Sequence, residues 1–171
     1  MDLYVERQYI LQMKSGSLKQ FLMLYDACFV DLYKYVARRL GSGEEASEVT
    51  RLTFLDALGR IQDTPENGSY LIWLYGLARN RVWERLGAPG MEQPSSVIIA
   101  DGAVLDDEKR TLVSRFENMV QKLLMEEREI LRLKFFEEVT DGDVMVVMEI
   151  DEGSIGSKIY RVLKRVHFLL F

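Results

Sequence analysis

The sequence is poor in the residue types that most often hold metals, disulfides and catalytic centres. Its 171 residues include one cysteine, Cys28, and one histidine, His167. A single cysteine cannot close an internal disulfide, and neither residue type is numerous enough for the usual zinc ligand sets. No glycine-rich segment ends in the Gly-Lys-Ser/Thr of a phosphate-binding loop. We therefore expect no cofactor, no metal ion and no internal disulfide.

Long apolar runs and an excess of positive charge are absent as well. No apolar stretch approaches the roughly 18 residues that a membrane span requires, and the first residues carry acids where a signal peptide needs positive charge. We therefore expect a cytoplasmic protein without a membrane partner. The formal net charge of -5 argues against coating nucleic acid by bulk electrostatics, so any DNA contact must come from local basic faces.

The sequence gives little support to catalysis. The pair Glu44 and Glu45 could in principle do acid/base chemistry. Acids at the start of a helix are, however, usually a solvated face that complements the helix dipole. We therefore expect that the protein is not an enzyme.

What the sequence has instead is helical periodicity, with apolar residues recurring every three or four positions. This spacing predicts a helix from Leu18 to Leu40, ended by Gly41, and a second helix that runs to about residue 61. Ser42 and Glu45 have the form of a capping box for the second helix.

A loop is predicted at residues 62–69, followed by a third helix from about Tyr70 to Leu86. In the loop, Thr64-Pro65 resembles the start of a helix and Asn67-Gly68 resembles a turn. The third helix is apolar almost all round at its start, which predicts a central position in a first domain.

The composition changes after residue 86. Residues 87–112 carry two basic and five acidic residues, among them the group Asp101, Asp106, Asp107 and Glu108, after a stretch rich in Gly, Pro and Ser. We interpret this segment as a flexible acidic linker. The fold class is therefore predicted as all-α, with one helical domain at 1–86, the linker at 87–112 and a second helical domain at 113–171.

The last helix, over about residues 151–169, is the clearest in the second domain. Its apolar positions form one stripe, and its basic residues lie largely on the other side. Ser154 is predicted as its N-cap.

The third helix also carries a face that suits unpaired bases. Ile72, Trp73, Gly76, Asn80 and Trp83 are predicted to lie apart from the core stripe of that helix. Aromatic rings stack on bases, and neighbouring arginines can meet phosphates. The alternative for each tryptophan is ordinary packing in the core.

Several segments resemble the RNA polymerase sigma factors. Residues 32–40 (Leu-Tyr-Lys-Tyr-Val-Ala-Arg-Arg-Leu), 46–54 (Ala-Ser-Glu-Val-Thr-Arg-Leu-Thr-Phe) and 73–80 (Trp-Leu-Tyr-Gly-Leu-Ala-Arg-Asn) are similar, in order, to sigma region 2. Residues 124–136 are similar to the start of sigma region 4, a helix-turn-helix. The chain as a whole resembles the extracytoplasmic-function (ECF) sigma factors, group 4 of the sigma-70 family.

The resemblance implies that the protein binds core RNA polymerase, at its clamp and flap regions, and promoter DNA. An anti-sigma factor is a further candidate partner. The implied site residues fall into three sets. The polymerase-binding residues are Glu48, Arg51, Leu52, Phe54 and Asp56. The minus-10 residues are Asn67, Trp73, Arg79, Asn80, Arg81 and Trp83. The minus-35 residues are Ser154, Ser157, Lys158, Arg161 and Arg165.

The helix-turn-helix departs from the family pattern. Met145 and Glu149 stand where the family has a small alanine and a turn glycine, and Gly156 stands where a basic residue is frequent. These changes predict loss of packing, or strain, of about a kcal/mol or more. We therefore expect weak minus-35 recognition, and an auxiliary DNA-targeting protein becomes a candidate partner. The alternative function is a sigma mimic, which binds an anti-sigma factor or polymerase without opening DNA.

Overall fold

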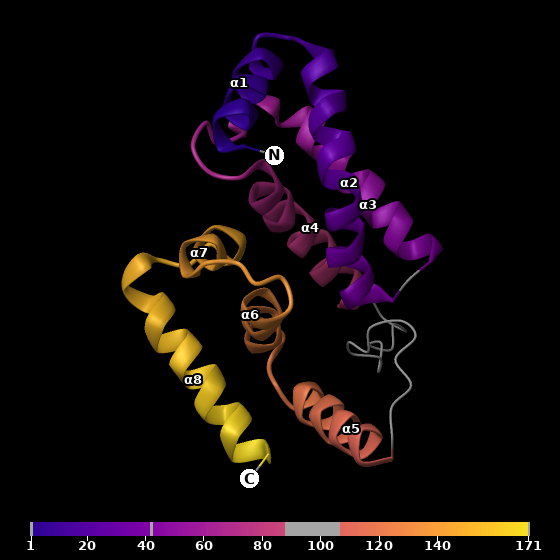
Figure 1. The fold of residues 1–171 in the computed structure, drawn as a ribbon, viewed down its shortest axis with the longest axis vertical. Helices are drawn as coiled ribbons and strands as arrows, with labels where there is room; N and C mark the ends of the chain where they lie inside the picture. Colours follow the sequence, from indigo (N-terminus) through magenta and orange to yellow (C-terminus); the bar gives the residue numbers. More distant parts are fainter. Residues whose placement is uncertain (1, 42, 88–106, 171) are drawn as a thin grey trace. The chain divides into compact units, whose positions relative to one another are not determined.

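The computed structural model describes residues 2–41, 43–87 and 107–170, and all regular structure within these ranges is helical (Figure 1). This bears out the predicted all-α fold class. Contacts divide the chain into two compact units, Met1–Gln93 and Pro94–Phe171. The predicted flexible linker concerns mainly residues 88–106, which lie outside the described residues.

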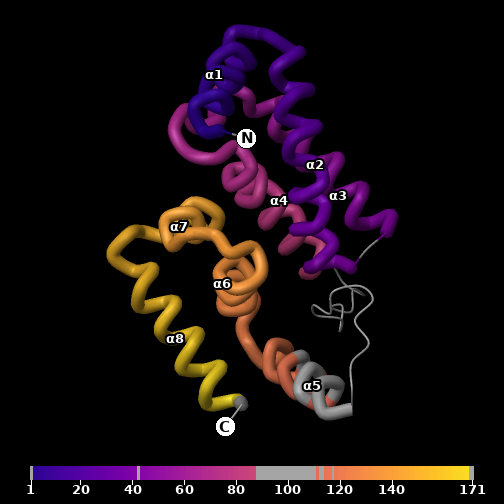
Figure 2. The backbone as a smooth tube through the Cα atoms, viewed as in Figure 1, coloured from indigo at the N-terminus to yellow at the C-terminus, as the bar shows by residue number. Residues whose placement is uncertain are grey.

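The first unit contains four α-helices and one short 3-10 helix among its described residues. These elements are α1 (Leu3–Lys14), α2 (Leu18–Leu40), α3 (Glu44–Gly59), η1 (Ile61–Asp63) and α4 (Tyr70–Leu86). Figure 2 shows α2, α3 and α4 running beside one another, and each of the three packs on the other two. Helix α1 packs on α2.

The core of the first unit contains an arginine among its aromatic residues. Tyr35 of α2 stacks on Tyr75 of α4, with ring centroids 4.2 Å apart. The guanidinium of Arg39 lies 3.5 Å from the centroid of the Tyr35 ring, and its Nη1 donates to the Tyr35 carbonyl at 2.7 Å. Arg39 is only 1% exposed, so the aromatic face and the carbonyl compensate the loss of hydration of its charge.

Two predicted helix caps and one start signal in the loop differ from the structure. The N-cap of α3 is Gly43, whose φ is 126°, and Ser42 lies outside the described residues. No helix begins at Thr64-Pro65, although this pair resembles a helix start, because Thr64 is the C-cap of η1. The predicted turn follows at Gly68, with a φ of 105°, and α4 begins at Tyr70 as predicted. Ser154 lies inside α8 and donates its hydroxyl to the Asp151 carbonyl.

The N-terminal helix was not predicted, and it supplies the missing cap of α4. The N-cap residue Ser69 makes no side-chain capping bond. Instead, the Glu6 carboxylate of α1 accepts a hydrogen bond from the Tyr70 amide, the first in α4. A buried acid at this position satisfies an amide that has no partner within the helix and complements the helix dipole. Glu6 therefore joins the start of the central helix to α1.

The second unit contains four helices among its described residues. They are α5 (Asp107–Gln121), α6 (Met125–Phe135), α7 (Asp141–Met148) and α8 (Glu152–Leu170), and α8 packs on the other three. Helix α5 begins inside the segment predicted as linker, so residues 107–112 are helical.

Candidate nucleic-acid and polymerase interface

The predicted polymerase-binding residues lie on α3, but not all of them are accessible. Glu48 and Arg51 are exposed, and Leu52 and Asp56 are half-buried. Phe54 is only 3% exposed, and its ring centroid lies 4.4 Å from that of Tyr25 on α2. Phe54 is thus a core residue that holds α3 against α2, which corrects its assignment to the contact face. The part of the other four in binding stays a prediction.

Ion pairs join α3 to the predicted DNA-binding helix α4. Arg81 pairs with Asp56, and Arg85 lies 3.0 Å from Glu48 and 3.5 Å from Glu45. The hydrogen bond with Asp56 raises the pKa of Arg81 above its ordinary value. Two acids predicted to face polymerase are therefore bound to arginines of the helix predicted to face DNA.

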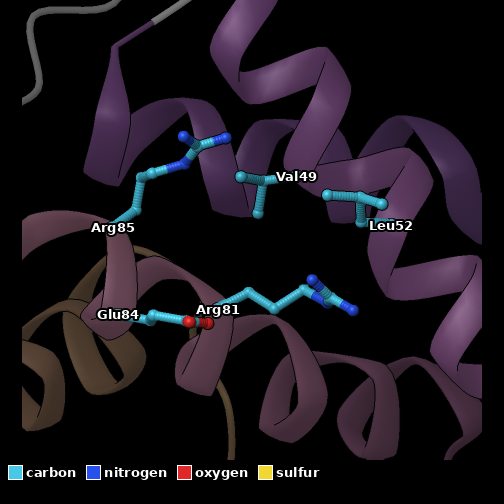
Figure 3. Close-up of a pocket in the computed structure, with 5 residues that line it drawn as sticks. All are labelled: Val49, Leu52, Arg81, Glu84 and Arg85. Carbon is cyan, nitrogen blue, oxygen red and sulfur yellow. The ribbon is translucent and has the colours of Figure 1, made fainter. Parts of the chain in front are cut away.

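A pocket of about 310 Å³ lies beside these pairs, between α3 and α4. It is lined by Val49, Leu52, Arg81, Glu84 and Arg85. Figure 3 shows both arginine side chains extending from α4 toward the helix that carries Val49 and Leu52. Since the arginines engage acids of α3, they act here as part of the helix contact.

Arg79 occupies a position that the sequence did not indicate. It is 5% exposed, with its guanidinium 5.1 Å from the Trp83 ring centroid. Its Nε and Nη2 both donate to Asn80 Oδ1, at 3.1 and 2.7 Å. A side chain buried in this way does not present its charge to solvent, which corrects the expectation that Arg79 meets phosphates. Asn80 itself is exposed.

The remaining minus-10 residues lie at the edges of the same unit. Trp73 is half-buried, with its ring centroid 5.6 Å from that of Tyr70, and Trp83 is also half-buried. Asn67 is exposed, in the turn before α4. Ile72 is 8% exposed and belongs to the core, which corrects its placement on the exposed face. The two tryptophans are thus neither fully packed in the core nor fully open to a ligand.

The predicted minus-35 residues on α8 divide into two groups. Ser157 and Arg161 are exposed, and Ser154 is half-buried. Lys158 is ion-paired with Glu126 of α6, and Arg165 lies 3.1 Å from Glu127 of the same helix. These two cations face α6, because α8 packs on that helix. At Gly156 a Cβ atom would meet open space, so this position adds no side chain to the exposed face.

The turn between α7 and α8 has the strained conformation that the sequence predicts. Glu149 ends α7 with a φ of 54° and a ψ of 47°, the left-handed region in which glycine is favoured. At the other end of α7, Thr140 and Asp143 form a reciprocal capping box: the Asp143 amide donates to Thr140 Oγ1 and the Thr140 amide to Asp143 Oδ2, both at 3.1 Å. The start of α7 is therefore well capped, and the backbone strain lies at its C-cap residue, Glu149.

One structural residue escaped the sequence analysis although a signal for it was present. Glu6, Ile10 and Met13 are all buried on one face of α1, at helical spacing. An acid within an apolar stripe indicates a buried carboxylate that needs a donor. Burial of the Glu6 carboxyl raises its pKa, and the hydrogen bond from the Tyr70 amide partly opposes that rise.

In the part of the chain that the structure describes, no group of three or more His, Cys, Asp or Glu side chains is placed to hold a metal ion. None of the described helices combines the length and apolar character needed to span a bilayer.

Comparison with known proteins gives sequence relatives that cover nearly the whole chain, although no family model matches. The chain is 24% identical to the ECF RNA polymerase sigma factor SigW of Bacillus subtilis, over 94% of each chain. It is 22% identical to the RNA polymerase sigma-H factor of Pseudomonas aeruginosa, over 94% of this chain and 91% of that protein. It is 26% identical to the ECF sigma factor BldN of Streptomyces coelicolor, over 92% of this chain and 62% of that protein.

Solved structures show the same fold. CnrH, solved in complex with the cytosolic domain of CnrY, matches with a TM-score of 0.67 at 19% identity, over 99% of this chain and 97% of that one. The sigma factor RpoE of Bartonella quintana, solved with the anti-sigma factor NepR, matches with a TM-score of 0.65 at 17% identity, over 90% and 98%.

The helical fold and the ordered motifs define the class: this chain is similar to the RNA polymerase sigma factors. Within that class, the predicted resemblance to the ECF group is confirmed, because two of these relatives are ECF sigma factors.

Proposed function

We propose that this protein is an ECF sigma factor, which binds core RNA polymerase and directs it to promoters without catalysing a reaction itself. The similarity to sigma factors over more than nine-tenths of the chain carries this proposal. The first unit binds the polymerase clamp through α3 and opens the minus-10 element with α4. The second unit contacts polymerase at the flap and reaches the minus-35 region with α8.

The amides and aromatic rings of α4 support the DNA-opening role. Trp73 and Trp83 are half-buried, so part of each ring is available for stacking on an unpaired base. Asn67, in the turn before α4, and Asn80 are also exposed. Arg81 contributes to DNA binding when it leaves its pair with Asp56.

Recognition of the minus-35 element by this chain is weak, and three observations support that part of the proposal. Glu149 takes a left-handed conformation in the turn that orients α8. Gly156 presents no side chain, and Lys158 is paired with an acid of α6. A strong minus-10 element, or a second DNA-bound protein that delivers the factor, then selects the promoter.

An anti-sigma factor is the proposed regulatory partner. The two solved relatives of the same fold were each captured with a second protein, the cytosolic domain of CnrY and the anti-sigma factor NepR. By analogy, we propose that a protein of this type holds the chain inactive until its release.

Run-off transcription with core polymerase, with and without this chain, tests the function on genomic fragments of its host. Promoter-specific transcripts that need the chain are expected. Replacing Trp73 and Trp83 by Ala is expected to abolish open complexes while polymerase binding persists. Binding without any transcript, from any fragment, would instead indicate a sigma mimic.

The same assay tests the minus-35 proposal. Scrambling the minus-35 region of an active promoter is expected to change the transcript level little. A large loss on scrambling would contradict weak recognition and leave the rest of the function intact.

A further inference from the structure

The exposed amide of Asn80 is fixed from behind by a buried arginine. Arg79 Nε and Nη2 donate to the same atom, Asn80 Oδ1, at 3.1 and 2.7 Å. A guanidinium has donors only, so the carbonyl end of the Asn80 amide must face Arg79. Two donors also occupy both lone pairs of that oxygen. The group that Asn80 can offer to a ligand is therefore its Nδ2 amino group.

The arginine is itself held in place. Arg79 is 5% exposed, and its guanidinium lies 5.1 Å from the centroid of the Trp83 ring. A planar guanidinium bound at its edge and covered on its face has little freedom to rotate. The contacts from Trp83 to Arg79 and from Arg79 to Asn80 thus hold the exposed amide in one orientation. DNA binding then loses little conformational entropy at this side chain.

We propose that Arg79 is a positioning residue for DNA reading, and that it makes Asn80 a hydrogen-bond donor to the opened minus-10 strand. The ligand group that fits is an acceptor, either a base carbonyl or ring nitrogen, or a phosphate oxygen. Arg79 acts through Asn80 and does not touch DNA. This inference rests on the proposed function, because it assumes that α4 faces DNA.

A double-mutant cycle on DNA affinity separates this role from a direct contact. The probe is a fluorescein-labelled single-stranded DNA carrying the minus-10 segment of the promoter found by run-off transcription, bound to the assembled holoenzyme. Asn80→Ala removes the donor and is expected to weaken binding about tenfold. Arg79→Lys keeps the positive charge but cannot make the two hydrogen bonds to Asn80 Oδ1, so a similar loss of DNA affinity is expected. The double variant is expected to bind no more weakly than Asn80→Ala alone.

Arg85→Lys serves as the matched control, since Arg85 lies on the same helix but pairs with Glu45 and Glu48. Any fold-change in DNA affinity from Arg85→Lys is expected to multiply with that from Asn80→Ala, because the two residues act independently. If the losses from Arg79→Lys and Asn80→Ala also multiply, Arg79 contacts DNA directly and the inference is overturned.

Asn80→Asp gives a second test that leaves Arg79 intact. The aspartate still accepts from Arg79, so thermal unfolding at or above the wild-type temperature is expected. The outward group becomes an acceptor with a negative charge, so DNA affinity should fall further than with Asn80→Ala, by about another tenfold. Binding equal to or tighter than that of Asn80→Ala overturns the inference, even if Arg79→Lys does not fold.

The outcomes also separate this inference from the proposed function. If the holoenzyme transcribes the promoter but the affinity losses from Arg79→Lys and Asn80→Ala multiply in the double variant, only the positioning role of Arg79 is rejected. A wild-type holoenzyme that yields no transcript from any fragment rejects the proposed function, and the inference is rejected with it because it rests on that function.

A scan of the probe then identifies the acceptor. Replacing single phosphates by methylphosphonates removes charged phosphate acceptors, and single abasic sites remove base acceptors. The position at which Asn80→Ala no longer matters is the contact of the Asn80 amino group.

Discussion

Glu149 ends α7 in a conformation that glycine adopts more easily, so its replacement tests how much the turn costs. With a φ of 54° and a ψ of 47°, the Cβ of Glu149 crowds the following carbonyl, which costs about 1–2 kcal/mol for an L-residue. Glycine removes this crowding but gains freedom in the unfolded chain, which offsets about 0.4–1 kcal/mol. Taking the middle of each range, Glu149→Gly is expected to stabilise the second unit by about 0.5–1 kcal/mol.

Thermal unfolding followed by circular dichroism measures this effect. For a unit of this size, 1 kcal/mol shifts Tm by about 4–8 °C, so a rise of about 2–8 °C is expected in the transition of the second unit. Glu152→Gly is the control, because Glu152 is exposed in the first turn of α8. Glycine there should lower Tm, since it costs about 1 kcal/mol in a helix.

The reasoning has a clear point of failure. If Glu149→Gly lowers Tm as much as Glu152→Gly does, the left-handed conformation is not a burden on the turn. A second measurement connects the turn to function: binding of Glu149→Gly to duplex minus-35 DNA should tighten if strain in the turn contributes to weak recognition. Unchanged DNA binding with a raised Tm would assign weak recognition to the surface of α8 alone.

Three further predictions concern charged groups. Burial raises the pKa of Glu6 above its ordinary 4.5, so the folded chain binds this proton more tightly than the unfolded chain and loses stability as pH rises through the raised pKa. Glu6→Gln keeps an acceptor for the first amide of α4 but carries no buried charge. Its Tm in thermal scans should therefore exceed that of the wild type at pH 8 and equal it near pH 4. A difference in Tm that is larger at pH 4 would contradict this. Asp56→Asn frees Arg81 from its ion pair, so the variant chain without polymerase should bind single-stranded DNA more tightly. Compared with Asp26→Asn, a control with the same charge change on α2, the affinity should be about two- to threefold higher. Equal affinities of the two variants in fluorescence anisotropy would refute the idea that Asp56 competes with DNA for Arg81. Glu126→Gln should tighten binding to duplex minus-35 DNA by a similar factor, because it frees the lysine of α8 with which it pairs, and a gel-shift titration showing no change would reject that competition.

The sequence predicted the helical units best where periodicity was long and stops were clear. The predicted spans of α2 and α4 match the observed ones, Leu18–Leu40 and Tyr70–Leu86, because each carries apolar residues at helical spacing over several turns. Helix α1 was missed because its buried face includes an acid, Glu6, which interrupts the apolar pattern. The left-handed conformation of Glu149 was predicted correctly, since it follows from the position of a single residue in a turn.

Side-chain partners from other helices lay beyond the reach of the sequence. The partners of Lys158 and Arg165 are acids of α6 that are more than thirty residues distant, and Asp56 binds Arg81 across the α3–α4 contact. Spacing along one helix predicts which face a residue occupies, but not which neighbour lies opposite. Three of the cations predicted to contact DNA, Arg81, Lys158 and Arg165, are therefore ion-paired within the free protein.

The amino-acid sequence by itself determined the class of protein and most of the helices, and it suggested residues for binding DNA and polymerase. Local spacing and ordered motifs are properties of the chain, so no tertiary contact was needed to find them. Only the tertiary structure decided which charges face solvent and which are consumed by packing: Glu6 caps α4, and Arg79 fixes Asn80. The physical reason is that a buried charge must find a partner, and packing between helices determines which partner is within reach.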